Sequence, residues 1–94
     1  MNKKKLAIIR KKIDTVDVNI LNLIKKRMTL VRQMINIKNH KYEIVDKKRE
    51  KNILKNIKRK SINKNIDPQI TDKIWKSMIL SFANYQRRKF KKKR

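Results

Sequence analysis

The sequence contains no glycine, no cysteine and only one proline, Pro68. Without glycine most tight hairpin turns are excluded, so a sheet of β-hairpins is not expected. Without cysteine, disulfides and cysteine-based metal sites are excluded. One histidine, His40, and seven scattered acidic residues do not suffice for a zinc site, so we expect no metal. Long amphipathic helices are the structure that this composition favours.

Long apolar runs are also missing. No segment approaches the roughly 18 consecutive apolar residues that a membrane-spanning helix needs. The basic residues 1–5 are not followed by the uninterrupted apolar segment of a secretory signal. We therefore expect a soluble, cytoplasmic protein without a membrane partner. Its 94 residues fit a single domain, residues 1–94, whose small core would gain from a partner subunit.

Acidic residues are scarce beside 30 lysines and arginines, and the formal net charge is +23. Such a charge is typical of proteins that bind polyanions, and nucleic acid is the obvious candidate. However, Lys, Asn and Ile are raised together, and these are the residues that A/T-rich codons favour. Drift in base composition explains that combination better than selection for a DNA-binding face. We expect no nucleic-acid partner beyond non-specific charge attraction.

Apolar residues recur in steps of three and four from about Lys4 to Ile37, which predicts one long helix with an apolar seam. The seam comprises Leu6, Ile9, Ile13, Val16, Ile20, Leu23, Leu30, Met34 and Ile37. A helix of about 32 residues measures roughly 48 Å, which exceeds the diameter of a compact domain of this size. One chain cannot cover such a seam, so a second copy is the simplest cover.

Two shorter helices are expected after a polar loop at residues 39–41. The first runs from about Asp46 to Lys60, and its inward residues are Ile53, Leu54 and Ile57. A second loop, residues 61–66, precedes the other helix.

Asp67 and Pro68 mark the start of the last helix as its N-cap and its first helical residue. This helix should run to about Arg88 and be followed by a basic tail, residues 88–94, that is frayed at its end. The predicted fold class is therefore all-α, with three helices, a long first helix and an intertwined homodimer.

Polar residues occupy positions that the apolar pattern reserves for the core. The seam passes from Leu23 through Arg27 to Leu30, and a buried guanidinium requires an anion. Either one of the few acidic residues or a bound ligand would supply it. In the last helix, the apolar row that leads to Phe90 includes Gln86. A buried amide there would donate into a cavity, whereas at a helix end it would face water.

Further charged residues lie on or beside these rows. Glu50 and Asp46 share a face with the apolar residues of the second helix, so we expect both to point toward its apolar side. Arg10 and Lys38 lie near the two ends of a heptad row beside the seam, where a solvated charged face is the alternative; that alternative is expected for Asp17.

Several cations with a few acceptors suit a small dianion that carries a hydroxyl, because Arg recognises carboxylates by paired hydrogen bonds. No Ser-His-Asp or Cys-His set is available for nucleophilic catalysis. Catalysis by orientation and electrostatics remains.

An ordered set of short stretches covers nearly the whole chain. The stretches are Leu6-Ala7-Ile8-Ile9-Arg10, Ile13-Asp14-Thr15-Val16-Asp17, Leu23-Ile24-Lys25-Lys26-Arg27, Lys38, Asp46-Lys47-Lys48-Arg49-Glu50, and Ile74-Trp75 through Gln86. Their order and spacing resemble those of the all-helical chorismate mutases. The resemblance implies a homodimer with two equivalent pockets, each made mostly by one chain, that isomerises chorismate to prephenate in aromatic amino-acid biosynthesis. It implies no cofactor and no metal, since the rearrangement is pericyclic.

The resemblance also implies roles for individual residues. Arg10 would reach into the pocket of the neighbouring subunit. Arg10, Arg27 and Arg49, together with Lys38, would hold the two carboxylates of chorismate.

The remaining implied contacts concern the ring and the breaking bond. Asp46 and Glu50 would accept a hydrogen bond from the ring hydroxyl. Lys38 and Gln86 would act catalytically by donating to the ether oxygen, where negative charge builds in the transition state.

Phe82 departs from the mutase pattern, because many mutases carry a serine four residues before the glutamine. Isochorismate pyruvate-lyases, which form salicylate on the same fold, can have an aromatic residue near that point. The lyase is therefore an alternative, although Glu50 fits the mutase pattern more closely. A basic helical protein that binds nucleic acid is a further alternative, but the sequence has no recognised DNA-binding motif.

Overall fold

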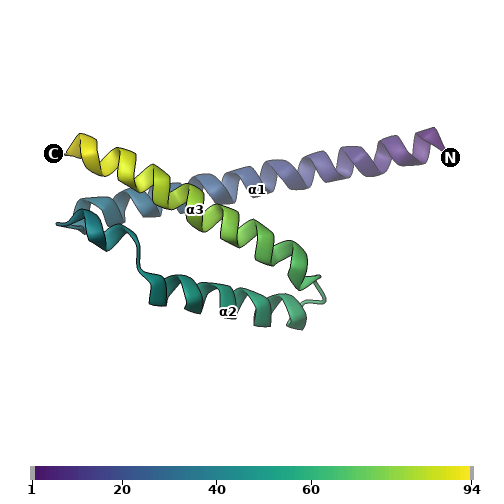
Figure 1. Ribbon diagram of the computed structural model, residues 1–94. Coiled ribbons are helices and arrows are strands. Elements are labelled where there is room, and N and C mark those ends of the chain that lie inside the picture. Colours follow the sequence, from purple (N-terminus) through teal and green to yellow (C-terminus); the bar gives the residue numbers. More distant parts are fainter. Residues whose placement is uncertain (1, 94) are drawn as a thin grey trace. The chain divides into compact units, whose positions relative to one another are not determined.

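A computed structural model describes residues 2–93, apart from the side chains at positions 41 and 91–93, and its regular elements are all helices (Figure 1). Helix α1 covers Lys3–Ile37, α2 covers Lys47–Asn63 and α3 covers Pro68–Lys93. A short 3₁₀ helix, η1 (Lys41–Ile44), lies between α1 and α2 in the chain. The predicted all-α class with three α-helices and a long first one is confirmed.

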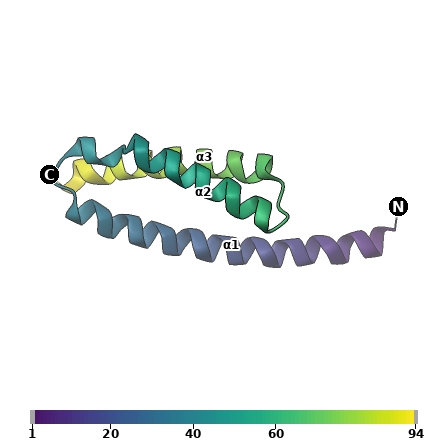
Figure 2. The ribbon, with the colours of Figure 1, turned by 90° about the horizontal axis from the view of Figure 1, so that it is seen from below.

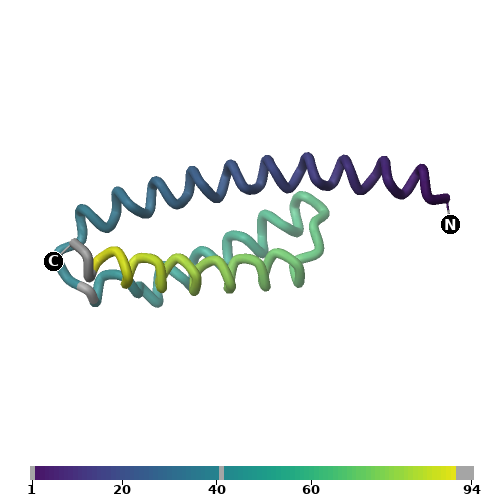
Figure 3. Tube along the Cα trace, turned by 90° about the horizontal axis from the view of Figure 1, so that it is seen from above, coloured from purple at the N-terminus to yellow at the C-terminus, as the bar shows by residue number. Residues whose placement is uncertain are grey.

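Helix α1 is one uninterrupted helix of 35 residues (Figure 3), which corresponds to roughly 52 Å at 1.5 Å per residue. The side chain of Asn2 caps its start by accepting a hydrogen bond from the backbone N–H of Lys5 at 3.1 Å. The chain divides into two compact units, residues 1–31 and residues 32–94, and the boundary falls within α1. The predicted bounds of this helix, about Lys4 to Ile37, are confirmed.

The first unit is a helical segment whose apolar seam is uncovered. Seam residues from Ile9 to Leu30 are exposed, with exposed fractions of 52% at Ile13 and 65% at Leu23. These side chains have the spacing that normally packs against another helix. No described helix combines the length and the apolarity that a bilayer crossing requires.

The second unit has its own core. Helices α2 and α3 run side by side in opposite directions (Figures 1 and 2), and η1 also contacts α3. The buried apolar residues of this unit are Ile35, Ile44, Phe82 and Phe90. Ile53, Leu54 and Ile57 are half-buried, as expected for the inward row of α2. The core therefore draws on the end of α1, on η1 and on α3.

The end of α1 shows a face that the seam pattern did not predict. Ile35, which is outside the seam, is buried, whereas the seam residues Met34 and Ile37 are exposed. Lys38 lies three residues beyond Ile35 and is half-buried, because residues three apart share a helix face. The last turns of α1 thus have two apolar faces, of which the seam is the one left exposed.

The connection between α2 and α3 differs from the predicted loop, residues 61–66, because α2 continues to Asn63. Ser61 is buried, and its hydroxyl donates back to the carbonyl oxygen of Ile57 at 2.6 Å, which allows a polar residue to remain inside the helix. The helix ends where Asn65 adopts φ 58°. Asparagine tolerates this left-handed conformation, for which glycine is the usual residue. The N–H of Ile66 then donates to the carbonyl of Ser61 at 2.9 Å.

Helix α3 begins as predicted and ends later than predicted. Asp67 caps it by accepting from the N–H of Gln69 at 2.9 Å, and Pro68 is its first residue. The predicted end near Arg88 is wrong, since α3 runs through Lys93 and Phe90 is only 2% exposed. Burial of that ring extends the helix into the segment expected as a tail. Arg94 lies outside the described residues.

Candidate active site

Lys38 and Gln86 are joined across the second unit. The ammonium of Lys38, just beyond the last turn of α1, donates a hydrogen bond to Oε1 of Gln86 on α3, with Nζ and Oε1 2.8 Å apart. Gln86 is 6% exposed, so the prediction that it lies on an inward row is confirmed. The backbone N–H of Lys38 also donates to the carbonyl of Met34 at 3.0 Å, which holds Lys38 in helical register.

The electrostatic environment of Lys38 contains opposing effects. Burial lowers the pKa of Lys38 below the usual range of lysine. The carboxylates of Glu43 and Asp46 act in the opposite direction, because negative charge stabilises the ammonium. Lys38 is therefore a cation held in a partly desolvated place beside an amide, where hydrogen bonds from a charged donor are strong.

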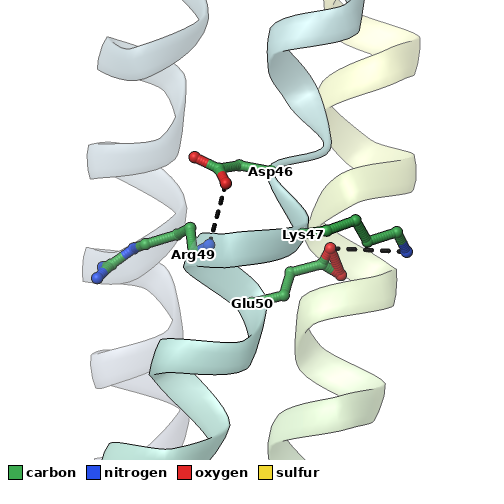
Figure 4. A network of polar contacts seen from close by, with 4 residues as sticks. All are labelled: Asp46, Lys47, Arg49 and Glu50. Carbon is green, nitrogen blue, oxygen red and sulfur yellow. Dashed lines mark hydrogen bonds and ion pairs between the residues drawn. The ribbon is translucent and has the colours of Figure 1, made fainter.

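Four charged residues surround the start of α2 (Figure 4). Asp46 is its N-cap, and its Oδ1 accepts from the backbone N–H of Arg49 at 3.0 Å. Oε2 of Glu50 lies 3.9 Å from Nζ of Lys47. The same oxygen is inaccessible to solvent and accepts no hydrogen bond from the described residues. A buried carboxylate oxygen without a donor is costly, which distinguishes Glu50 from the other three.

The expectation for the acidic pair is half right. Glu50 is half-buried, as predicted, but Asp46 is exposed and does not point toward the apolar side of α2. The reason is the capping role, which holds the carboxylate beside the first-turn N–H groups of the helix. Arg49 is exposed, and Figure 4 shows its guanidinium extending to the opposite side of this turn from the Glu50 carboxylate.

Arg10 and Arg27 belong to the first unit. Arg10 is exposed, as most of that unit is. Arg27 is half-buried, and its Nη1 is inaccessible to solvent, although the seam residues Leu23 and Leu30 on either side are exposed. Arg27 thus lies at its predicted seam position, and part of its guanidinium group is shielded from solvent.

The family model for chorismate mutase type II matches residues 9–87. The chain belongs to this family. A chorismate mutase from Methanocaldococcus jannaschii is 42% identical over 77 residues, which cover 81% of this chain and 78% of that protein. No solved structure gives a significant match.

Phe82 is the position where this member departs from the serine of many chorismate mutases. Its ring is buried and meets the ring of Tyr85 edge-on, with centroids 6.5 Å apart and planes at 80°. Such a geometry is favourable for aromatic pairs. Phe82 therefore places an apolar ring one helical turn before Gln86, at the position where many chorismate mutases have the polar hydroxyl of a serine.

A second link between α1 and α3 was not predicted from the sequence. The hydroxyl of Tyr85 accepts a hydrogen bond from Nε of Arg32 at 2.6 Å, and Nζ of Lys89 lies 5.8 Å from the centre of the Tyr85 ring. Tyr85 directly precedes Gln86, so this contact lies beside the Lys38–Gln86 pair. No periodicity marks Tyr85, because it lies beside the apolar row and not on it.

Glu43 was also missed. Its Oε1 accepts from the backbone N–H groups of Asn39 at 3.2 Å and His40 at 2.9 Å. The three-residue spacing from His40 to Glu43 is that of a capping box, and it is the signal that could have identified this contact. Within the described residues, no group of three or more potential ligands is arranged to hold a metal ion.

Proposed function

We propose that this protein is a chorismate mutase that rearranges chorismate to prephenate, and that it acts as a homodimer in the cytoplasm as part of aromatic amino-acid biosynthesis. The proposal rests on the family match over residues 9–87 and, within the site, on the Lys38–Gln86 pair. The two compact units form one catalytic domain, since the family match spans the boundary between them.

The Lys38–Gln86 pair serves the bond-breaking step. Chorismate breaks a carbon–oxygen bond while a carbon–carbon bond forms, and negative charge builds on the ether oxygen. An ammonium carries three N–H donors and a glutamine amide two. A pair joined at 2.8 Å can present donors from both groups to one oxygen. Because that oxygen is more negative in the transition state than in the substrate, these donors lower the barrier.

The arginines serve orientation. The flexible side chain of chorismate must be held over the ring, and paired hydrogen bonds from guanidinium groups to its carboxylates fix that geometry. We assign this role to Arg27 and Arg49, with Lys38, and to Arg10 of the neighbouring subunit. The half-buried state of Arg27 supports its assignment. Asp46 and Glu50 accept from the ring hydroxyl, and the unsatisfied Oε2 of Glu50 supports its part.

The homodimer is supported by the exposed seam of α1. Each large aliphatic side chain buried at an interface contributes about 1.5–3 kcal/mol. A second copy of α1 offers an equivalent seam, which is the requirement of a two-fold interface. Exposed Arg10 lies on the same stretch of helix, so it is available to a partner's pocket.

One observation keeps the isochorismate pyruvate-lyase as a second candidate, namely the buried ring of Phe82. The family match and the curated relative both favour the mutase. Neither comparison favours a nucleic-acid-binding protein.

The deciding experiment supplies the purified protein with chorismate or isochorismate, without added cofactor. We expect loss of chorismate and formation of prephenate, with little salicylate fluorescence from isochorismate. A faster reaction with isochorismate would assign the lyase, and no reaction with either would reject both.

Arg27→Ala tests the carboxylate clamp. We expect kcat/KM to fall about 10²–10³-fold, since a charge-assisted contact to the substrate is lost. Arg59→Ala, at an exposed position of α2, is the matched control and should be active. Wild-type activity in Arg27→Ala would reject the role assigned to this arginine.

A further inference from the structure

The chain immediately after Lys38 is fastened by a single carboxylate. Oε1 of Glu43 accepts from the N–H groups of Asn39 and His40, the two residues that follow Lys38, at 3.2 and 2.9 Å. The N–H of Glu43 in turn donates to the carbonyl of His40 at 3.1 Å. These bonds close a short cycle that fixes the backbone conformation directly after α1. They therefore also fix the direction in which the Lys38 side chain extends from the backbone.

The other side of this cycle is attached to the helix that carries Gln86. Glu43 lies in η1, which contacts α3, and the next residue, Ile44, is 7% exposed. A buried aliphatic side chain is an anchor that resists displacement. Glu43 therefore connects the backbone beside Lys38 to an element that is packed against α3.

Glu43 also acts on Lys38 through its charge. Burial lowers the pKa of Lys38. Two carboxylates oppose this effect by raising that pKa, and the effect of Glu43 is larger than that of Asp46. The groups around the ammonium include Glu43 on η1, Asp46 before α2 and the neutral Gln86 on α3. Asp46 is exposed and caps α2, whereas Glu43 is half-buried. Solvent screens a half-buried charge less than an exposed one.

We propose that Glu43 is a positioning residue of the mutase reaction, which holds the Lys38 ammonium charged and directed at Gln86 through its backbone clasp and its negative charge. It does not touch the substrate. The inference rests on the proposed function, because Lys38 must act on chorismate for its placement to matter. It assigns a catalytic purpose to a segment that would otherwise serve only to connect α1 to α2.

A purely structural cap would have different consequences. Loss of a cap lowers the free energy of unfolding but leaves kcat and its pH dependence unchanged in the protein that remains folded. Loss of a positioning residue changes kcat more than KM, since the Lys38 contact is strongest in the transition state.

The test compares Glu43→Gln and Glu43→Ala with Asp72→Asn. Glutamine keeps an acceptor oxygen for the clasp and removes the charge, while alanine removes both. Asp72→Asn is the matched control, because it also removes one carboxylate, from a surface ion pair with Lys76 at 2.9 Å on α3. For each variant, kcat and KM for chorismate are measured from neutral to alkaline pH, together with urea unfolding.

We expect Glu43→Ala to lower kcat about tenfold with a smaller change in KM. In Glu43→Gln, the alkaline loss of activity should move to lower pH, because the charge that favours the ammonium is gone. Asp72→Asn should match the wild type. If Glu43→Ala does not fold, Glu43→Gln decides.

A second measurement does not depend on activity. The protein is labelled with ¹³C at the lysine ε-carbon, and the signal that disappears in Lys38→Arg identifies Lys38. Its titration midpoint should be lower in Glu43→Gln than in the wild type and unchanged in Asp72→Asn. Unaltered kcat, pH profile and midpoint in Glu43→Gln, with an active wild type, would overturn the inference. An inactive wild type would instead reject the proposed function.

Discussion

The two units of this protein treat their apolar residues differently. In residues 32–94, Ile35, Ile44, Phe82 and Phe90 are buried within one chain. In residues 1–31, nearly the whole seam is exposed, although its spacing is that of a packed helix. The second unit can thus place Lys38, Gln86 and Glu50, to which we assign roles in the proposed site, by contacts of its own. The first unit, which carries Arg10 and Arg27, leaves its seam uncovered, and the proposed homodimer would cover it.

The difference also separates two kinds of site residue. The polar groups of the second unit are placed by contacts within that unit, such as the 2.8 Å bond between Lys38 and Gln86. Arg10 and Arg27 of the first unit lie on α1, beside a seam that is exposed. Changes in the first unit should therefore act on assembly and activity together, whereas changes in the second should act on catalysis or stability separately.

The largest effect is expected from charging the seam. Ile13→Asp combined with Ile20→Asp would bury two unpaired carboxylates in the proposed dimer interface, which costs several kcal/mol for each ion. We expect a monomer by analytical ultracentrifugation and a loss of activity of at least 100-fold. The control, Thr15→Asp with Asn22→Asp, adds the same charge away from the seam and should remain an active dimer. If the seam variant remains dimeric and active, the seam of the first unit does not form the proposed dimer interface.

Removal of the Lys38 ammonium, to which we assign a catalytic role, should have the next largest effect. Lys38→Ala should lower kcat about 10²–10³-fold, because a preorganised donor to the ether oxygen is lost, while the dimer persists. Lys55→Ala, at an exposed position of α2, is the control and should be unaffected. Steady-state assays with chorismate measure both; a normal kcat in Lys38→Ala would show that the pair with Gln86 has no catalytic role.

The effect of pH on kcat/KM should be small near neutral pH and should increase at alkaline pH. Burial lowers the pKa of Lys38, so the ammonium is present below that pKa and is lost above it at a pH lower than for an ordinary lysine. We expect kcat/KM to fall about tenfold per pH unit once that pKa is passed. The fall should be absent from the residual activity of Lys38→Ala, and its persistence there would assign it to another group.

The smallest effect concerns the pairing of α2 with α3. The hydroxyl groups of Ser61 and Thr71 are buried and 2.7 Å apart. Thr71→Val keeps the shape and removes this hydrogen bond, so urea unfolding should show a loss of about 1 kcal/mol with kcat unchanged. Thr15→Val, on the exposed face of α1, should change stability less. A large loss of activity in Thr71→Val would mean that the hairpin helps to position Gln86.

The sequence predicted the features that local rules determine. The three α-helices, the cap at Asp67 and the inward position of Gln86 follow from periodicity and capping chemistry. The end of α2 was wrong, because a serine in a lysine- and asparagine-rich stretch is typical of a loop. The hydroxyl of Ser61 bonds the carbonyl of Ile57 within the helix and contacts Thr71 on α3, and the second contact depends on tertiary packing that the sequence pattern does not contain.

Other parts of the site depend on packing that a one-dimensional pattern does not contain. Ile35 was missed because the seam was assigned to a single face of α1, and the end of that helix has two apolar faces. Glu43 and Tyr85 act through contacts with residues on other elements. Asp46 is exposed because its carboxylate caps the start of α2, and a carboxylate held there cannot also point toward the apolar side of that helix.

The turn at Asn65 explains how this fold tolerates a complete loss of glycine. Among the described residues, only Asn65 takes a left-handed backbone conformation, which glycine usually adopts in proteins. A helical hairpin with a single such position can therefore be built without glycine, whereas a protein with many glycine turns could not.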